Sequence, residues 1–240
     1  NVSLSDYLIW GGFPGRLANT TLEGTKAYLF DLERTIVIND LIKSYKIKNE
    51  VAFKKVVNFV LRSNSRIFSI RSIHKAMKSD FPNLAVTTVA RYMECLKEAY
   101  IIDEIAQYST KTKSELKYFG KIYNCDVCLN SLKVSNNIYD LDHNLENIVY
   151  NELLYMGYEL KVLINKDKEI DFLATKDNKT FLIQVAYSVA NEKAYEREIS
   201  VFDNLDNRNE KILITNDIID YSTSLVRHIK LEDFLMMEEL

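Results

Sequence analysis

The chain has 240 residues, of which 47% are hydrophobic and 27% charged, a composition typical of a folded protein with a buried core. Six glycines, two prolines and no visible repeat exclude collagen-like, low-complexity and repeat architectures. No apolar run approaches the roughly 18 residues of a membrane span, and no basic-then-apolar leader opens the sequence. Three cysteines do not suit a disulfide framework. We therefore expect a cytoplasmic protein that makes no membrane contact.

The net charge of −3 hides an uneven distribution of charge along the chain. Residues 46–124 carry 15 basic and 7 acidic side chains, whereas residues 125–240 carry 12 basic and 22 acidic ones. A basic segment of this size indicates contact with a polyanion, most simply nucleic acid, although lysine-rich solvated helix faces give the same count. The acidic half either only favours solubility or clusters carboxylates for a metal ion.

Residues 51–124 predict three helices followed by a two-stranded hairpin. Apolar residues recur with helical spacing from Val51 to Leu61, Ser69 can cap a second short helix, and a third helix follows Pro82. Two strands, over residues 101–108 and 116–124, enclose a polar turn. This order is the plan of a winged helix, whose third helix fits the major groove of DNA.

The residues expected to face DNA lie on the third helix and at the tip of the hairpin: Thr87, Thr88, Arg91, Lys97, Lys111 and Lys113. Lysines at the hairpin tip contact phosphates, which adds affinity and salt dependence but not sequence choice. Winged helices also serve as protein-docking modules, so partner binding stays open as the alternative interpretation.

The region after Asp140 predicts an α/β unit. A helix with one apolar stripe runs to Gly157, which ends it as a C-cap does. The strands are expected over residues 158–164, 169–174, 181–186 and 211–215, with a helix over 191–205 and an edge element over 229–235.

Oxygen ligands gather on two of these strands. Strand alternation puts Glu169 and Asp171 on one face, and the short turn at 176–179 allows Asp171 to lie beside Gln184. With a glutamate from the preceding helix, these oxygens form a site for a hard cation such as Mg²⁺ or Mn²⁺. Such a metal polarises a phosphodiester and activates water.

These residues carry a family resemblance. The run ENIVYNELLYMGYELKVLINKDKEIDFLATKDNKTFLIQVAYSV resembles the PD-(D/E)XK nuclease-like fold found at the C-terminus of a family of prokaryotic AAA+-type ATPases. YLIWGGFPGRL (Tyr7–Leu17) resembles the GGxP segment of that family, and INDLIKSYKIKN (Ile38–Asn49) resembles the helix that follows it. KIYNCDVCL resembles the strand that closes its winged helix, so the resemblance covers nearly the whole chain.

The resemblance implies an α+β chain in three parts: a helical ATPase-lid remnant (1–45), a winged helix (46–135) and a restriction-endonuclease-like α/β domain (136–240). The sequence contains no G-x-x-x-x-G-K-[ST] phosphate loop. We therefore expect the C-terminal region of a longer ATPase, with ATP bound by the parent protein and its own N-terminal ATPase domain as a partner. Arg16, after the GGFP turn, is implied to sense that nucleotide; a surface arginine is the alternative interpretation.

The nuclease-like site departs from the family pattern. The resemblance matches Glu146 to the helix Glu, Asp171 to the metal-binding Asp, and Gln184-Val185-Ala186 to the (D/E)xK element. Gln184 thus replaces an acidic ligand, and Ala186 stands where the water-activating Lys belongs, unless that role passes to Lys166, Lys168 or Lys193. We expect a degenerate catalytic site at Glu146, Asp171 and Gln184, with a weak metal site at Asp171 and Gln184.

Three functional hypotheses follow. The first is a DNA- or partner-binding region of an ATPase with a degenerate nuclease-like domain and no cofactor in this chain. The second is an active Mg²⁺- or Mn²⁺-dependent DNA nuclease. The third is a protein–protein interaction module, in which the acidic half of one copy docks the basic segment of another to form a homo-oligomer. Whether the chain is an enzyme stays open.

Overall fold

The structure of the protein is a computed structural model, and its fold is α+β with a mixed sheet. The structure describes residues 2–112, 114–205 and 208–240, without the side chains of residues 37 and 114–118. The chain forms two compact units: the first runs to Glu104 and includes Ile122–Asp140, and the second consists of Ile105–Lys121 and Leu141–Leu240. None of the described helices has an apolar stretch long enough to cross a lipid bilayer.

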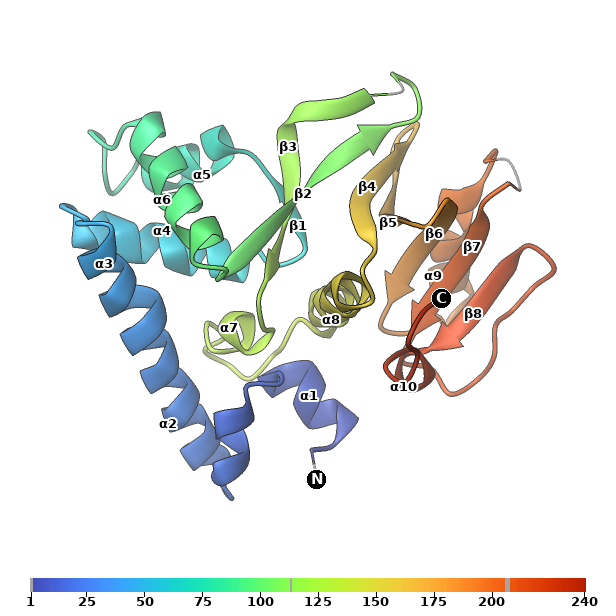
Figure 1. Cartoon of the computed structure of the whole chain (residues 1–240), viewed down its shortest axis with the longest axis horizontal. Coiled ribbons are helices and arrows are strands. Elements are labelled where there is room, and N and C mark those ends of the chain that lie inside the picture. Colours follow the sequence, from blue (N-terminus) through green and yellow to red (C-terminus); the bar gives the residue numbers. More distant parts are fainter. Residues whose placement is uncertain (1, 113, 206–207) are drawn as a thin grey trace. The chain divides into compact units, whose positions relative to one another are not determined.

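The N-terminal part of the first unit is helical (Figure 1). It contains α1 (Leu4–Trp10), η1 (Pro14–Ala18), α2 (Leu22–Leu32), the π-helical η2 (Glu33–Asp40) and α3 (Leu41–Ser44). The helix implied over Ile38–Asn49 therefore ends at Ser44. Its end has a backbone cause, because Lys46 has φ 49°, a left-handed conformation that a right-handed helix cannot continue through.

The three helices predicted from apolar spacing are confirmed as α4 (Glu50–Arg62), α5 (Ile70–Met77) and α6 (Val86–Glu98). Ser69 starts α5 as predicted, since its hydroxyl accepts from Ser72 N while the Ser72 side chain accepts from Ser69 N. The apolar faces of the three helices share one core, with Phe53, Ile73 and Met93 almost wholly buried. A further short helix, α7 (Cys128–Ser131), adds Cys128 and Leu129 to that core.

The predicted hairpin is confirmed as β2 (Ile102–Ser109) and β3 (Ser114–Asn124). The two ends of the hairpin belong to the first unit. There, Ser65 N donates a hydrogen bond to Ile122 O, and Ser65 is the residue just before the short strand β1 (Arg66–Phe68). Residues Ile105–Lys121 of the hairpin belong to the second unit. The structure thus groups the expected segment 1–45 with the helices of 46–135, and divides the hairpin between the two units.

The second unit is built on a mixed sheet in which β3, β2, β4, β5, β6, β7 and β8 follow one another (Figure 1). Antiparallel β4 (Glu159–Asn165), β5 (Lys168–Lys176) and β6 (Lys179–Ala186) confirm three of the predicted strands. Parallel neighbours extend the sheet, with β2 beside β4 and with β7 (Glu210–Thr215) and β8 (Val226–Lys230) beyond β6. The short helix α10 (Leu231–Phe234) follows β8, where the edge element was expected.

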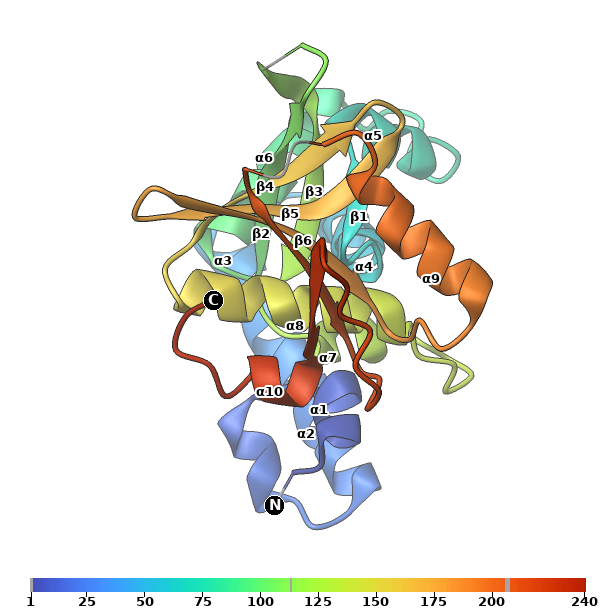
Figure 2. The ribbon, with the colours of Figure 1, turned by 90° about the vertical axis from the view of Figure 1, so that its right-hand side faces the viewer.

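Two helices cover opposite faces of this sheet (Figure 2). The Tyr150 ring of α8 (Leu141–Tyr155) packs on Phe172, with the ring centroids 6.2 Å apart. Glu198 of α9 (Glu192–Ile199) instead accepts a hydrogen bond from Gln184. Gln184 lies opposite Asp171, the residue before Phe172, in the neighbouring strand. Because neighbouring residues of a strand point to opposite faces, α8 and α9 lie on different sides.

Helix α9 is shorter than the predicted helix over 191–205. It ends at Ile199, and the chain continues as the 3₁₀ turn η3 (Ser200–Phe202). The Ser200 hydroxyl donates to Arg197 O (2.8 Å), and the turn buries Val201 and Phe202. The apolar residues that suggested a longer helix are therefore buried by a turn.

Candidate functional site

Three acidic side chains surround one buried lysine in the second unit. Nζ of Lys121, on β3, lies 2.6 Å from Glu146 Oε1 of α8. The same Nζ lies 2.7 Å from Glu169 Oε1 and 3.0 Å from Asp171 Oδ1, both on β5. The side chains of Lys121, Glu146 and Asp171 are 4%, 9% and 8% exposed. We call these four residues the lysine–carboxylate cluster; helix α8 and strands β3 and β5 supply its charges.

Asp171 is held in place from the backbone of the neighbouring strand. Its Oδ2 accepts from Val185 N (3.0 Å), and its own N donates to Gln184 Oε1 (3.4 Å). The prediction that Asp171 and Gln184 lie side by side is thus confirmed, in the register that pairs Phe172 with Ile183. The orientation of this carboxylate is set by the sheet, which is the rigid support that a reactive site needs.

The structure gives a physical reason for a glutamine at position 184. Gln184 Nε2 donates to Glu198 Oε2 (2.8 Å), and Glu198 Oε1 accepts from Arg197 Nε (2.8 Å). A carboxylate at position 184 has no N–H to donate and would face Glu198 across a buried contact. The amide therefore allows a further acid, Glu198, to lie next to the cluster.

The electrostatics of the cluster keep its lysine charged. Burial acts to lower the pKa of the Lys121 ammonium, but the carboxylates of Asp171, Glu146 and Glu169 outweigh burial and hold that pKa above its usual value. Lys121 is therefore a permanent cation at neutral pH. With all three acids ionised, the cluster has a formal charge of −2, an excess that is costly away from water. A divalent cation would remove that excess.

The acids converge on the ammonium rather than on one another. Within residues 2–112, 114–205 and 208–240, no three His, Cys, Asp or Glu side chains are grouped as a ready-made metal site. The donors nevertheless suit a hard cation in type, since Glu146 and Asp171 offer carboxylate oxygens. A metal ion at this place would have to share those oxygens with Lys121.

The predicted site residues Glu146, Asp171 and Gln184 come together, and the structure adds Lys121 and Glu169 to them. Lys121 is a lysine inside a buried strand segment, followed by Ile122 and Tyr123, both with 0% exposure. The sequence analysis did not select Lys121, although a charged residue in such a run is a signal that could have found it, because lysine is rarely buried without a partner.

The lysines considered as substitutes do not form the cluster. Lys168 pairs with Asp203 (3.4 Å) and donates to Ser200 O (2.8 Å). Within the described residues, neither Lys166 nor Lys193 forms an ion pair with the three acids. Ala186 itself is 4% exposed and packs with Leu182 and Leu213 in an apolar cluster. A lysine there would bring its charge into apolar surroundings.

The predicted DNA-facing residues of the first unit have different surroundings. Thr88 and Arg91 line a cavity of about 300 Å³ together with Lys46 and Lys48, two cations that the sequence analysis did not select. Arg91 Nη2 donates to Tyr45 O (3.1 Å). No acidic side chain lines this cavity within the part of the chain that the structure describes.

The other predicted DNA contacts are scattered. Thr87 is exposed on α6, and Lys97 is engaged by Glu94 (2.7 Å) and Glu104 (3.1 Å). Lys111 is exposed but belongs to the second unit. Lys113 lies outside the described residues. Arg16 is only 6% exposed, which excludes its interpretation as a surface arginine.

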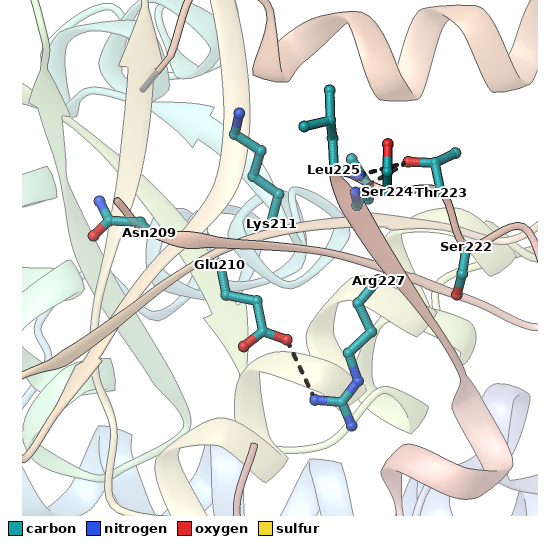
Figure 3. A pocket seen from close by; sticks show the side chains of 9 residues that line it. Asn209, Glu210, Lys211, Ser222, Thr223, Ser224, Leu225 and Arg227 are labelled. Atoms are coloured by element: carbon teal, nitrogen blue, oxygen red, sulfur yellow. Dashed lines mark hydrogen bonds and ion pairs between the residues drawn. The ribbon is translucent and has the colours of Figure 1, made fainter. Parts of the chain in front are cut away.

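A separate cavity of about 460 Å³ lies along β7 and β8 (Figure 3). Glu210 and Arg227 form an ion pair of 3.4 Å on one side of it, while Lys211 points to the other side of the strand. The remaining lining side chains are small or apolar: Asn209, Ser222, Thr223, Ser224, Leu225 and Val226. None of the predicted site residues lines it, so the lysine–carboxylate cluster remains the candidate site.

Comparisons relate the chain to proteins without an assigned role. The family described as "Domain of unknown function (DUF8612)" matches residues 1–137. An uncharacterized protein of Haemophilus influenzae is 29% identical over 219 residues, which are 88% of this chain and 52% of the relative. An uncharacterized protein of Methanocaldococcus jannaschii is 31% identical over 225 residues, 89% of this chain and 49% of the relative. The chain thus spans about half the length of these curated relatives, and no solved structure matches it significantly.

Proposed function

The chain belongs to the DUF8612 family of domains, whose function is unknown, so we infer its activity from its site. We propose that the second unit is a metal-dependent DNA nuclease domain of the PD-(D/E)XK type. One observation carries the proposal: Lys121 Nζ lies 3.0 Å from Asp171 and 2.6 Å from Glu146. The main reason to consider the site degenerate was the alanine at position 186. Lys121 offers the missing ammonium from β3 instead.

The chemistry follows from the charges of the cluster. Glu146 and Asp171 are the residues that would hold Mg²⁺ or Mn²⁺, which when bound polarises a phosphodiester and lowers the pKa of water. Lys121, which stays protonated, stabilises negative charge that develops on the attacked phosphate. Glu169, whose side chain is the most exposed of the three acids at 27%, can accept a proton from a water molecule.

A second candidate function, DNA binding by the first unit, rests on the cavity lined by Lys46, Lys48 and Arg91. Many other cations of the basic segment are neutralised locally, as in the pairs Lys97–Glu104 and Arg66–Asp140. Lys46 and Lys48 have no salt bridge to an acid among the described residues, so their charge is available to phosphates. We propose that α4, α5 and α6 are the helices of a winged helix that holds the DNA backbone.

The proposal also concerns the longer polypeptide to which this chain would belong. Relatives of about twice the length leave room for the ATPase core that the resemblance implies, and the chain then acts as the DNA-handling region of an ATP-dependent protein. The ATPase domain is its partner within the same polypeptide. Self-association through the acidic and basic halves stays a prediction, to be tested by the salt dependence of the oligomeric state.

Cleavage of labelled duplex, single-stranded and branched DNA in Mg²⁺ or Mn²⁺ tests the nuclease. We expect the parent to cleave at least one form, Asp171→Asn to lose cleavage, and Lys121→Arg to lose most of it. Arginine retains the positive charge and the ion pairs, but a planar guanidinium does not replace a compact ammonium. Lys168→Met, a change at an exposed lysine of β5, is the matched control and should cleave like the parent.

The outcomes separate the two candidates. Equal cleavage by the parent and Asp171→Asn would mean a contaminating nuclease and overturn the first proposal, as would the absence of cleavage above the Asp171→Asn background. DNA binding is measured separately, by fluorescence anisotropy across a salt series. Lys48→Ala and Arg91→Ala should each weaken binding and make its salt dependence shallower by about one unit. Lys97→Ala, whose cation is already paired, should bind nearly like the parent.

A further inference from the structure

A second cavity of the first unit adjoins the cationic cavity that Lys46 and Lys48 line. It has a volume of about 450 Å³ and lies between the turn that precedes α6 and Asn49, the N-cap of α4. Asn49, Thr88 and Tyr92 line both cavities. The two cavities therefore meet along these three residues and form one groove, which we call the α4–α6 groove.

The charges of the α4–α6 groove lie at one end. The cavity of about 300 Å³ contains Lys46, Lys48 and Arg91, and we call it the cationic end. The acid in the wall of the neighbouring cavity, Asp80, already pairs with Lys55. A phosphate would therefore be attracted to the cationic end, whereas the acid at the other end has its charge compensated.

The other end of the groove contains an aromatic ring, and we call it the aromatic end. Phe81 is half-buried against the core of the helices, while the neighbouring Pro82 and Asn83 are exposed. The amides of Asn49 and Asn83 both lie in the wall. Aromatic rings stack on nucleobases, and amides hydrogen-bond the edges of bases that have left the helical stack. This wall therefore has the chemistry of a site for a single base.

The turn that forms the aromatic end is held in place by its own hydrogen bonds. Phe81 N donates to Met77 O (3.0 Å), and Leu84 N donates to Phe81 O (3.0 Å). His74 Nε2 donates to Leu84 O (2.8 Å), which ties the turn to α5. A wall that is already ordered costs less conformational entropy when a ligand binds to it.

We propose that the α4–α6 groove binds single-stranded DNA, with a phosphate at the cationic end and an unstacked base at the aromatic end. This inference rests on the proposed DNA binding by the first unit and names the form of DNA that it binds. Bases in a duplex are paired and stacked, so a duplex would place phosphates at the cationic end and leave the aromatic end unfilled. A single strand can turn a base outwards and fill both ends.

Fluorescence anisotropy of the full chain, in EDTA so that no metal-dependent cleavage occurs, tests this inference. The probes are a labelled oligo(dT) and a labelled duplex of the same length. We expect the parent to bind the oligo(dT) at least about fivefold more tightly, which is the gain from one stacked base. Phe81→Leu keeps an apolar side chain against the core but removes the ring. It should weaken oligo(dT) binding at least about fivefold and leave duplex binding unchanged.

Asn83→Ala changes an exposed residue of the same wall and should also weaken oligo(dT) binding without affecting the duplex. It decides the result if Phe81→Leu does not fold. Phe30→Leu is the matched control, since Phe30 is 48% exposed on α2 and is not among the residues that line the groove. It should bind both forms of DNA like the parent.

The outcomes distinguish this inference from the DNA binding on which it rests. Duplex bound as tightly as oligo(dT), or unchanged oligo(dT) affinity in Asn83→Ala and in folded Phe81→Leu, would overturn the inference and leave the proposed DNA binding standing. No binding of either form would overturn both. Free thymidine monophosphate is the competitor: if it bound as tightly as the oligo(dT), the groove would be a nucleotide site and the single-strand proposal would be wrong.

Discussion

Removing the ammonium from the lysine–carboxylate cluster should destabilise the protein more than removing any exposed lysine. At separations of 2.6–3.0 Å and an effective dielectric constant near 20, each ion pair with Lys121 is worth about 5–6 kcal/mol before desolvation is subtracted. Breaking a buried pair leaves the partner charge uncompensated and costs about 3–5 kcal/mol net. We expect Lys121→Met to lower the free energy of unfolding by that amount.

Urea denaturation at pH 7.5 measures this loss, with Lys168→Met as the control. Lys168 is 46% exposed, and its removal should cost less than about 1 kcal/mol. The double variant Lys121→Met/Glu146→Gln should recover part of the loss, because it removes one of the carboxylates left without a counter-ion. A Lys121→Met variant within about 1 kcal/mol of the parent, or no recovery in the double variant, would refute the electrostatic account.

The pH dependence gives an independent check of the same cluster. Because the pKa of Lys121 is held above its usual value of 10.5, its contribution to stability is complete below pH 10.5 and disappears only as the pH rises through the higher folded-state value. The contribution is therefore constant between pH 6 and 9 in the parent. The free-energy difference between the parent and Lys121→Met, measured by urea denaturation, should therefore not fall as the pH rises from 7 to 9.

Three further predictions concern other parts of the fold. Ser69→Ala removes the capping box of α5 and should cost about 0.5–2 kcal/mol in denaturant unfolding; no loss would mean that the cap is not stabilising. Asn165→Ala removes a buried hydrogen bond to Val201 O and a partly buried one to Asp203 O, and should cost about 1–3 kcal/mol, with faster amide exchange around η3 as the second readout. Burial lowers the pKa of His228 below 6.5, with Asp220 acting in the opposite direction, so the stability from neutral His228 is complete above pH 6.5 and is lost as the pH falls through the lower folded-state value. His228→Gln should flatten that acid-side loss, and an unchanged pH profile would contradict it.

Local patterns in the sequence were sufficient for most helices and strands. The apolar spacing of α4 and α6 and the hydroxyl of Ser69 act within a few residues, so their signals do not depend on the rest of the fold. The neighbourhood of Asp171 and Gln184 was also predictable, because a two-residue turn joins β5 to β6 and side chains alternate along both strands. The prediction of a long helix over 191–205 was wrong at its end, because a turn there buries Val201 and Phe202.

Only some residues of the candidate site could be predicted from those local patterns. The sequence by itself determined that Glu169, Asp171 and Gln184 would share a strand pair, since local alternation fixes which face each side chain takes. Tertiary structure alone decided that Lys121, 50 residues before Asp171, would supply the cation, and that Glu198 would require an amide at position 184. The physical reason is that the partner of a buried charge is set by the packing of elements far apart in the sequence. The local spacing of apolar residues carries no information about that packing.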